Sequence, residues 1–286
     1  MWLSYGAPTL MSASLVVSME PQINTLYEGD CVEVMRQWDD SCVDHCIADP
    51  PYNMSKKGGL AWAFSSHVTM SERWDMYQRS VYLEFCRAWL MQVCRVVRPN
   101  GNIFIFGSFH NIYDLGHLIH EMDLKVLNSI VWFKPNAQPN ITCRMLTEST
   151  EHIIWACNAP KDKARGWVFN YDVAKQLNQG RQLRNMWRIP YPSATERRYG
   201  KHPSQKPLEL IGRIMLIATK KGDLILDCFG GSGTTAVVAN SFGRQWVTIE
   251  KNSEYNEIAR RRLAQVRVPW PKQLVQAELD FGGEEG

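Results

Sequence analysis

The fold of this chain is first indicated by the stretch Leu224-Ile225-Leu226-Asp227-Cys228-Phe229-Gly230-Gly231-Ser232-Gly233-Thr234-Thr235. Its leading apolar residues predict a short buried strand, and Thr234 begins a predicted helix. The three glycines between them let the backbone turn tightly and let a ligand approach closely. The stretch is neither G-x-G-x-x-G nor a P-loop, because no Gly-Lys-Ser/Thr follows. It therefore predicts a strand–turn–helix unit.

A carboxylate follows the next predicted strand, residues 245–249. Glu250 lies at the distance after Asp227 at which an acid can hold both hydroxyls of a ribose. With the glycine-rich turn, this acid indicates a nucleoside-binding βαβ unit. The alternative is a turn with a structural role only.

A second candidate site is Asp49-Pro50-Pro51-Tyr52, directly after the apolar run at residues 43–48. The two prolines make this turn stiff and extended. Ligands of open α/β sheets bind just beyond the carboxyl ends of the strands. A carboxylate, two carbonyls and an aromatic ring at such a place suggest a site, although an ordinary proline-rich turn is the alternative.

Strands and helices alternate along the rest of the chain. This alternation predicts an α/β fold with a mostly parallel, doubly wound sheet covered on both faces. The expected strands are residues 24–27, 43–48, 102–106, 125–133, 152–157, 224–226 and 245–249, and the expected helices are 31–38, 77–97, 110–122, 207–219, 234–240 and 253–266. We expect a loose N-terminal arm at 1–22, a long mobile loop at 53–74 and an acidic flexible tail at 269–286.

Composition places the chain among globular proteins, with 45% hydrophobic and 21% charged residues in 286. No apolar run is long enough for a transmembrane helix, and the N-terminus lacks the basic region of a signal peptide. None of the eight cysteines forms a C-x-x-C pair. We therefore expect free thiols in a reducing cytoplasm and no metal site.

The net charge of +3 is unevenly spread. Residues 158–206 contain eleven Lys or Arg against three Asp or Glu, a net of +8. A basic segment on a mildly acidic body predicts a polyanionic partner, and a solvated polar insertion is the alternative. Its cations are interleaved with Trp187, Tyr191 and Tyr199.

Taken together, the two motifs resemble those of S-adenosylmethionine-dependent DNA amino-methyltransferases, which modify adenine N6 or cytosine N4. Here the D-P-P-Y motif precedes the run D-x-F-x-G-x-G-T-T at residues 227–235, and the basic segment lies between them. That order resembles the permuted beta group of the family. Leu26-Tyr27-Glu28-Gly29-Asp30 and His202-Pro203-Ser204-Gln205-Lys206-Pro207 resemble two further family elements, although Thr is frequent where Ser204 stands.

The resemblance implies a division of the chain. Residues 23–157 would form the catalytic half of the methyltransferase domain, 158–201 a target-recognition insertion and 202–268 the cofactor-binding half. DNA binding would fall to Lys56, Lys57, Arg181, Arg184, Arg188, Arg197, Arg198 and Lys201.

The resemblance also implies roles for site residues. Asp49 and the Pro50 carbonyl would accept the two amino hydrogens of a flipped base, while Tyr52 stacks on it; Pro51 completes the catalytic motif. Asp30 would meet the cofactor adenine, Glu250 the ribose, and Lys206 the methionine carboxylate or a phosphate. The full set expected to bind S-adenosylmethionine is Asp30, Asp49, Ser204, Lys206, Asp227, Phe229, Gly231, Gly233, Thr234 and Glu250.

The target base follows from one residue within this family. Asp at the first motif position goes mostly with adenine and Ser mostly with cytosine, so Asp49 favours adenine N6 in double-stranded DNA. Cytosine N4, an RNA or protein-glutamine substrate, and a catalytically inactive DNA-binding module are the alternatives. Cytosine C5 chemistry is disfavoured, because no Pro-Cys dipeptide occurs. By resemblance we expect a homodimer and an associated restriction endonuclease.

Overall fold

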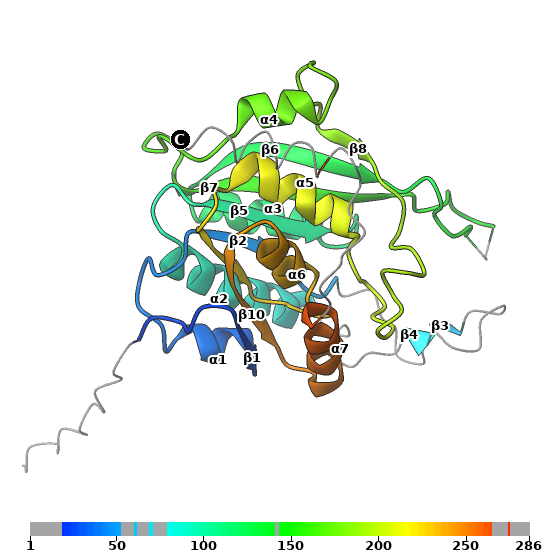
Figure 1. Ribbon diagram of the computed structural model, residues 1–286, viewed down its shortest axis with the longest axis horizontal. Helices are drawn as coiled ribbons and strands as arrows, with labels where there is room; N and C mark the ends of the chain where they lie inside the picture. The colour runs from blue at the N-terminus through cyan, green and yellow to red at the C-terminus, as the bar shows by residue number, and fades with distance from the viewer. Residues whose placement is uncertain are drawn as a thin grey trace, which may run out of the picture.

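The computed structural model describes residues 19–52, 60–61, 69–70, 79–140, 143–264 and 274. Within these residues, eight strands form one sheet in the order β1-β10-β9-β2-β5-β7-β6-β8, with helices on both sides (Figure 1). The strands are β1 (Thr25–Glu28), β2 (His45–Ala48), β5 (Asn102–Gly107), β6 (Leu124–Phe133), β7 (Thr150–Pro160), β8 (Met186–Arg188), β9 (Leu224–Asp227) and β10 (Gln245–Glu250).

Most neighbouring strands are parallel. β1, β10, β9, β2 and β5 pair in parallel, β7 is antiparallel to both of its neighbours, and β8 is parallel to β6. The predicted α/β class with a mostly parallel sheet is therefore confirmed.

At the centre of the sheet, two strands that are far apart in the sequence lie side by side. β2 pairs with β9, with Cys46 opposite Leu226. Because the two strands are parallel, their carboxyl ends meet at one edge of the sheet. This pairing brings the turn that begins at Asp49 beside the glycine-rich turn after Asp227.

Two groups of helices cover the two faces of the sheet (Figure 1). α1 (Cys31–Met35), α2 (Arg79–Val96) and α3 (Ile112–Glu121) share one hydrophobic core. α4 (Tyr171–Gln176), α5 (Leu208–Ala218) and α6 (Thr234–Ser241) share the other, and α7 (Ser253–Leu263) packs against α6 and β1. The sheet is doubly wound, as expected.

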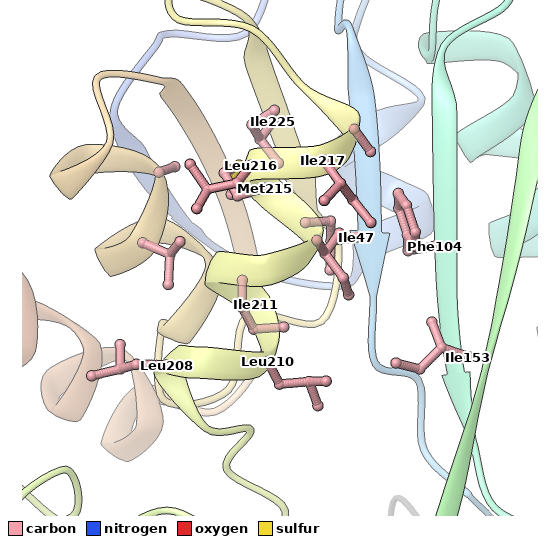
Figure 2. Close-up of a cluster of buried hydrophobic side chains, with 14 of the residues drawn as sticks. Ile47, Phe104, Ile153, Leu208, Leu210, Ile211, Met215, Leu216, Ile217 and Ile225 are labelled. Carbon is pink, nitrogen blue, oxygen red and sulfur yellow. The ribbon is translucent and has the colours of Figure 1, made fainter. Parts of the chain in front are cut away.

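α5 lies within the helix predicted at residues 207–219. Pro207 is the residue that precedes the helix, and almost every side chain of α5 is buried. Figure 2 shows Ile211 and Ile217 of α5 beside Ile47 of β2 and Phe104 of β5. The opposite side of α5 is covered by α4 and α6, and its two charged residues, Glu209 and Arg213, form an ion pair with each other.

The basic segment contributes to this sheet. β8 was not predicted as a strand, because three residues give too short an alternation to detect. It adds an edge to β6, and it carries Trp187 into the core, where only 2% of the side chain is exposed. The division of the chain at residues 158 and 202 stays a prediction.

Several predictions concern residues whose structure is not described. Residues 1–18 of the predicted arm at 1–22 are outside the described residues. So is the predicted tail at 269–286, except for residue 274. The loop at 53–74, including Lys56 and Lys57, also lies outside the described residues, apart from the strand pair β3 (Leu60–Ala61) and β4 (Thr69–Met70). No described helix is long and apolar enough to cross a membrane.

Candidate active site

A cavity of about 870 Å³ lies at the carboxyl ends of the parallel strands. Its volume is in the range of cofactor and small-ligand sites. It collects nearly all residues that the sequence predicted for catalysis and cofactor binding. These are Asp30, Asp49, Pro50, Pro51, Tyr52, Ser204, Lys206, Asp227, Phe229, Gly231, Thr234 and Glu250.

Gly233 is the one predicted member of the set that does not line the cavity. Its φ of 73° is left-handed, and an added Cβ would lie 2.7 Å from Ala259 Cβ. Gly233 therefore lets α7 approach the turn, and its direct contact with a cofactor is not supported.

Gly231 shapes the turn beside the cavity. Its φ is 49°, and an added Cβ would lie 2.8 Å from Nε2 of His202. Its backbone N–H donates to Glu250 Oε2 at 2.7 Å. The other Glu250 oxygen accepts from Asn252 N at 2.7 Å, so this carboxylate braces the glycine-rich turn. Burial raises the pKa of Glu250.

Asp227 and Asp30 place two more carboxylates around the cavity. Asp227 Oδ1 accepts from Phe229 N at 3.1 Å, and burial raises the pKa of Asp227 to about 7. Asp30 begins α1, where its Oδ1 accepts from Val32 N at 3.0 Å. Such capping orients Asp30 and leaves its second oxygen for a ligand, with Lys251 3.6 Å away.

The D-P-P-Y turn carries a buried polar network. Tyr52 Oη lies 2.8 Å from Asp49 Oδ1, and Lys206 Nζ lies 2.5 Å from Asp49 Oδ2. The Pro51 carbonyl accepts from Tyr82 Oη at 2.8 Å. Among the described residues, the Pro50 carbonyl accepts no hydrogen bond. The predicted role of the Pro50 carbonyl as a second acceptor stays a prediction.

Two residues of this network were not predicted from the sequence. Glu151 of β7 lies 2.9 Å from Tyr52 Oη through Oε2, and Lys134 Nζ lies 3.2 Å from Glu151 Oε1. Lys206 Nζ is also 3.5 Å from Glu151 Oε2. Lys134 follows β6 and Glu151 begins β7. The sequence does place Lys134 and Glu151 directly beside two predicted strands, 125–133 and 152–157, and this was the signal that could have found them.

The network is charge-balanced, with two carboxylates and two ammonium groups. Burial opposes ionisation of Lys206, but Asp49 and Glu151 outweigh it and raise the pKa of Lys206. Burial would raise the pKa of Glu151, but Lys206 and Lys134 hold it below its ordinary value. Burial raises the pKa of Asp49 against the attraction of Lys206. Pairing of Lys206 with a methionine carboxylate stays a prediction; in the structure its ammonium meets Asp49.

The cysteines beside the cavity are unsuited to nucleophilic chemistry. Cys31 and Cys228 line it, and burial raises the pKa of both thiols far above neutrality. Both therefore stay protonated, and a protonated thiol is a poor nucleophile.

Within the part of the chain that the structure describes, the cations predicted to bind DNA are solvent-exposed. Arg188 stacks on Phe133 at 5.9 Å, and Arg198 on Tyr199 at 4.7 Å. Trp187 instead packs in the core and donates from Nε1 to the Arg184 carbonyl, so it is not available to stack on a base. The exposed set within the described residues is Arg181, Arg184, Arg188, Arg197, Arg198 and Lys201.

Residues 43–261, more than half of the chain, match the family model described as DNA methylase, N6_N4_Mtase. The chain belongs to this family. The resemblance read from the two motifs is thus confirmed, and the protein is a DNA methyltransferase.

Two relatives of this DNA methylase are named type II methyltransferases. M2.MboI of Moraxella bovis is 39% identical over 246 residues, which cover 84% of this chain and 88% of that protein. M2.DpnII of Streptococcus pneumoniae is 41% identical over 240 residues, covering 83% and 88%.

Solved structures agree with the fold of this DNA methylase. The M1.HpyAVI–SAM complex has a TM-score of 0.62 at 29% identity, over 84% of this chain and 98% of that one. The cytosine-N4-specific PvuII DNA methyltransferase has a TM-score of 0.66 at 18% identity, over 90% and 92%. At that identity the second likeness concerns the fold alone.

Proposed function

We propose that this DNA methyltransferase transfers a methyl group from S-adenosylmethionine to N6 of adenine in double-stranded DNA. The observation that carries the proposal is Asp49, an Asp rather than a Ser, facing the cavity that the glycine-rich turn and Glu250 also line. The neighbouring Pro50 carbonyl accepts no hydrogen bond from another described residue. Asp49 and this carbonyl are the two acceptors that the two amino hydrogens of adenine require.

The residues around the cavity fit this cofactor. Its carboxylates, Asp30, Asp227 and Glu250, suit an adenine amino group, an ammonium and a ribose diol in turn. The cavity of about 870 Å³ has room for the cofactor and part of a base. When bound, the cofactor supplies an electrophilic methyl group on a sulfonium. The solved complex of M1.HpyAVI with SAM is consistent with this assignment.

The chain's own residues then orient the target. The adenine amino lone pair is delocalised into the ring, so the nitrogen is a weak nucleophile. Asp49 and the Pro50 carbonyl accept its hydrogens and turn the lone pair toward the methyl group, while Tyr52 stacks on the base. The methyl group moves directly from sulfur to nitrogen, so the sulfonium would become a neutral thioether. The methylated nitrogen then releases one of its two hydrogens as a proton to water, and no residue forms a covalent intermediate. The base must first leave the duplex at a cost of a few kcal/mol.

DNA would lie across the exposed arginines of residues 181–201. Most of these would contact phosphates, and one or two would read base edges. Because M2.MboI and M2.DpnII are named type II methyltransferases, we further infer an associated restriction endonuclease. From the family resemblance we also infer a homodimer that acts in the cytoplasm.

The test is sequencing that distinguishes N6-methyladenine from N4-methylcytosine, applied to DNA from cells expressing the wild type or Asp49→Ala. We expect N6-methyladenine in one short sequence context with the wild type and none with the variant. N4-methylcytosine would overturn the assignment of the base. If the genome is unmodified and the purified wild-type protein also fails to methylate DNA, the proposed activity is wrong.

A further inference from the structure

We propose that Glu151 is a positioning residue that draws Lys206 away from Asp49 when the target base enters, which frees one Asp49 oxygen for the amino group. This inference rests on the proposed adenine methylation. It concerns a residue that neither sequence motif contains.

Such a residue is needed because both carboxylate oxygens of Asp49 already have close neighbours. In the structure both of its oxygens have partners: Oδ1 meets Tyr52 Oη at 2.8 Å and Oδ2 meets Lys206 Nζ at 2.5 Å. The ammonium is buried, with 5% of the side chain exposed. A base amino group that hydrogen-bonds to Asp49 must therefore displace one of these two neighbouring groups.

Glu151 is a second acceptor within reach of both donors. Its Oε2 lies 2.9 Å from Tyr52 Oη and 3.5 Å from Lys206 Nζ. Lys206 thus needs to move about 1 Å to exchange a short contact with Asp49 for one with Glu151, a shift that side-chain rotation supplies. A buried ammonium keeps a carboxylate partner throughout, so the movement avoids an unpaired buried charge.

The hydrogen count of Tyr52 makes the exchange reciprocal. A phenol carries one hydrogen, so Tyr52 donates to Asp49 or to Glu151 but not to both. With Lys206 on Asp49, Tyr52 donates to Glu151, and its oxygen still lies 2.8 Å from Asp49 Oδ1 and fills the space beside that atom. With Lys206 on Glu151, Tyr52 donates to Asp49 Oδ1 and leaves Oδ2 for the base. Each carboxylate has a donor in both arrangements.

Lys134 sets the resting position of Glu151. Its Nζ binds Glu151 Oε1 at 3.2 Å, and 3% of its side chain is exposed. It also lies 5.4 Å from the Trp132 ring centre and 5.1 Å from that of Tyr191. These rings hold Lys134 on one side, so Glu151 presents its other oxygen, Oε2, to Tyr52 and Lys206.

The experiment compares Glu151→Gln with wild type in single-turnover methylation of a duplex containing the target sequence, with S-adenosylmethionine binding measured by calorimetry. We expect the methyl-transfer rate to fall by about tenfold to a hundredfold, the cost of misplacing a reacting group by about 1 Å. The Kd for S-adenosylmethionine should stay within about threefold of wild type. Glu148→Gln removes an exposed carboxylate from the same β6–β7 hairpin and should have no effect on either quantity.

A double-mutant cycle separates positioning from a structural role. If Glu151 acts by attracting Lys206, Glu151→Gln should cost little further rate when Lys206→Met is already present. Additive losses, or an unchanged rate in Glu151→Gln, would overturn the inference. Glu151→Asp keeps the charge and should recover part of the rate; if it is as slow as Glu151→Gln although folded, the charge of Glu151 is not the cause.

The two proposals fail in different ways. A wild type that modifies cytosine or nothing refutes the adenine assignment, whereas an active wild type with additive variants refutes only the role of Glu151.

Discussion

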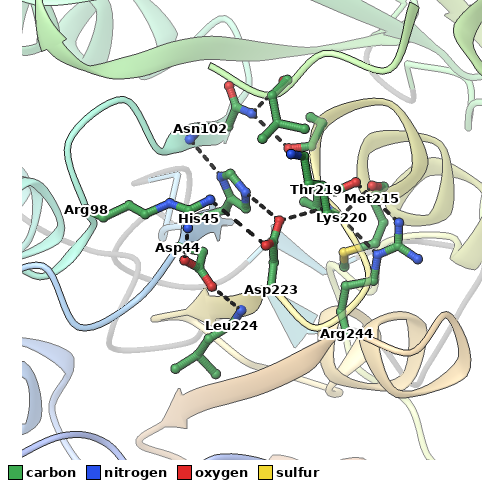
Figure 3. A network of polar contacts seen from close by, with 12 residues as sticks. Asp44, His45, Arg98, Asn102, Met215, Thr219, Lys220, Asp223, Leu224 and Arg244 are labelled. Atoms are coloured by element: carbon green, nitrogen blue, oxygen red, sulfur yellow. Dashed lines mark hydrogen bonds and ion pairs between the residues drawn. The ribbon is translucent and has the colours of Figure 1, made fainter. Parts of the chain in front are cut away.

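His45 donates from Nε2 to Asp223 Oδ2 across 2.9 Å, while its Nδ1 accepts the backbone N–H of Asn102 at 2.9 Å (Figure 3). Because Nδ1 accepts a hydrogen, Nε2 carries the ring hydrogen. The imidazole joins β2, β5 and the loop before β9 at the edge of the sheet opposite the active-site cavity. Burial raises the pKa of Asp223, but its bonds to His45 and the Lys220 backbone outweigh this and lower it.

The first prediction is that His45→Leu lowers the free energy of unfolding by about 3 kcal/mol, measured by urea denaturation near neutral pH. It leaves the buried Asn102 N–H without a partner, and Asp223 Oδ2 keeps only its bond from the Lys220 backbone N–H. Cofactor affinity should not change. His117→Leu, at an exposed position, is the control and should unfold at nearly the wild-type urea concentration.

This prediction has a pH signature. The pKa of Asp223 is lower in the folded state than its ordinary value of 3.8. Asp223 therefore stabilises the fold above pH 3.8, and this stability is lost as the pH falls below that value. The difference between His45→Leu and wild type should therefore narrow below about pH 4. An equal difference at all pH values would mean that the bond to Asp223 is not the source of the stability.

The second prediction concerns Asp49→Asn, which keeps the shape of the side chain and removes its charge. Methyl transfer should fall by at least about 100-fold, because the amide attracts an amino hydrogen more weakly and Lys206 loses one of its two counter-ions. Cofactor binding should persist when measured by calorimetry. Asp162→Asn, an exposed residue after β7, should be fully active. Near wild-type rates in Asp49→Asn would remove Asp49 from the catalytic step.

The third prediction is a pH dependence of cofactor affinity from Asp227, whose pKa is about 7 because it is buried. The ionised carboxylate attracts the cationic cofactor and the neutral acid does not. The Kd for S-adenosylmethionine should therefore fall about tenfold per unit as pH rises from 5 to 6.5 and level off above 7. Calorimetry at fixed ionic strength measures this. Asp227→Asn should bind weakly and without this slope; a variant that retains the slope would assign it to another group.

The fourth prediction compares two glycines with left-handed backbones. Gly231→Ala places a Cβ 2.8 Å from His202 Nε2, whereas Gly222→Ala meets nothing within 4 Å at φ 83°. Both variants should lose about 1 kcal/mol of stability from strain. Only Gly231→Ala should also lose cofactor affinity, by about tenfold or more, since its turn lines the cavity. Equal affinities would show that the turn tolerates the added methyl group.

The fifth prediction concerns the salt dependence of DNA binding. If Arg197 and Arg198 each contact a phosphate, replacing both by Ala should reduce the slope of log K against log salt by about 2. Fluorescence anisotropy with a labelled duplex measures it. Lys161→Ala, at the turn after β7 on the opposite edge, should leave the slope unchanged. If the Arg197 and Arg198 variant keeps the wild-type slope, DNA follows another path.

The site could be predicted where its chemistry is local in sequence. Asp49 and Asp227 each end or follow an apolar strand, and carboxyl ends of parallel strands share an edge, so their proximity follows from strand direction. Glu151 could not be found this way. Its charge beside the predicted strand at 152–157 is visible in the sequence, but the antiparallel direction of β7, which brings Glu151 to Tyr52, is not. Likewise, Trp187 among arginines suggests a stacking surface, but the pairing of β8 with β6 buries it.

The strand order has a consequence for how the molecule is made. β1 pairs only with β10 among the described residues, and β2 reaches its β9 partner only after residue 224. During synthesis from the N-terminus, the earliest strand therefore waits unpaired and the second keeps one open edge until the last quarter of the chain emerges. Unpaired strand edges can pair with the wrong strands or with other chains. Folding during synthesis therefore depends on how quickly residues 224–250, which form β9 and β10 between β1 and β2, are made.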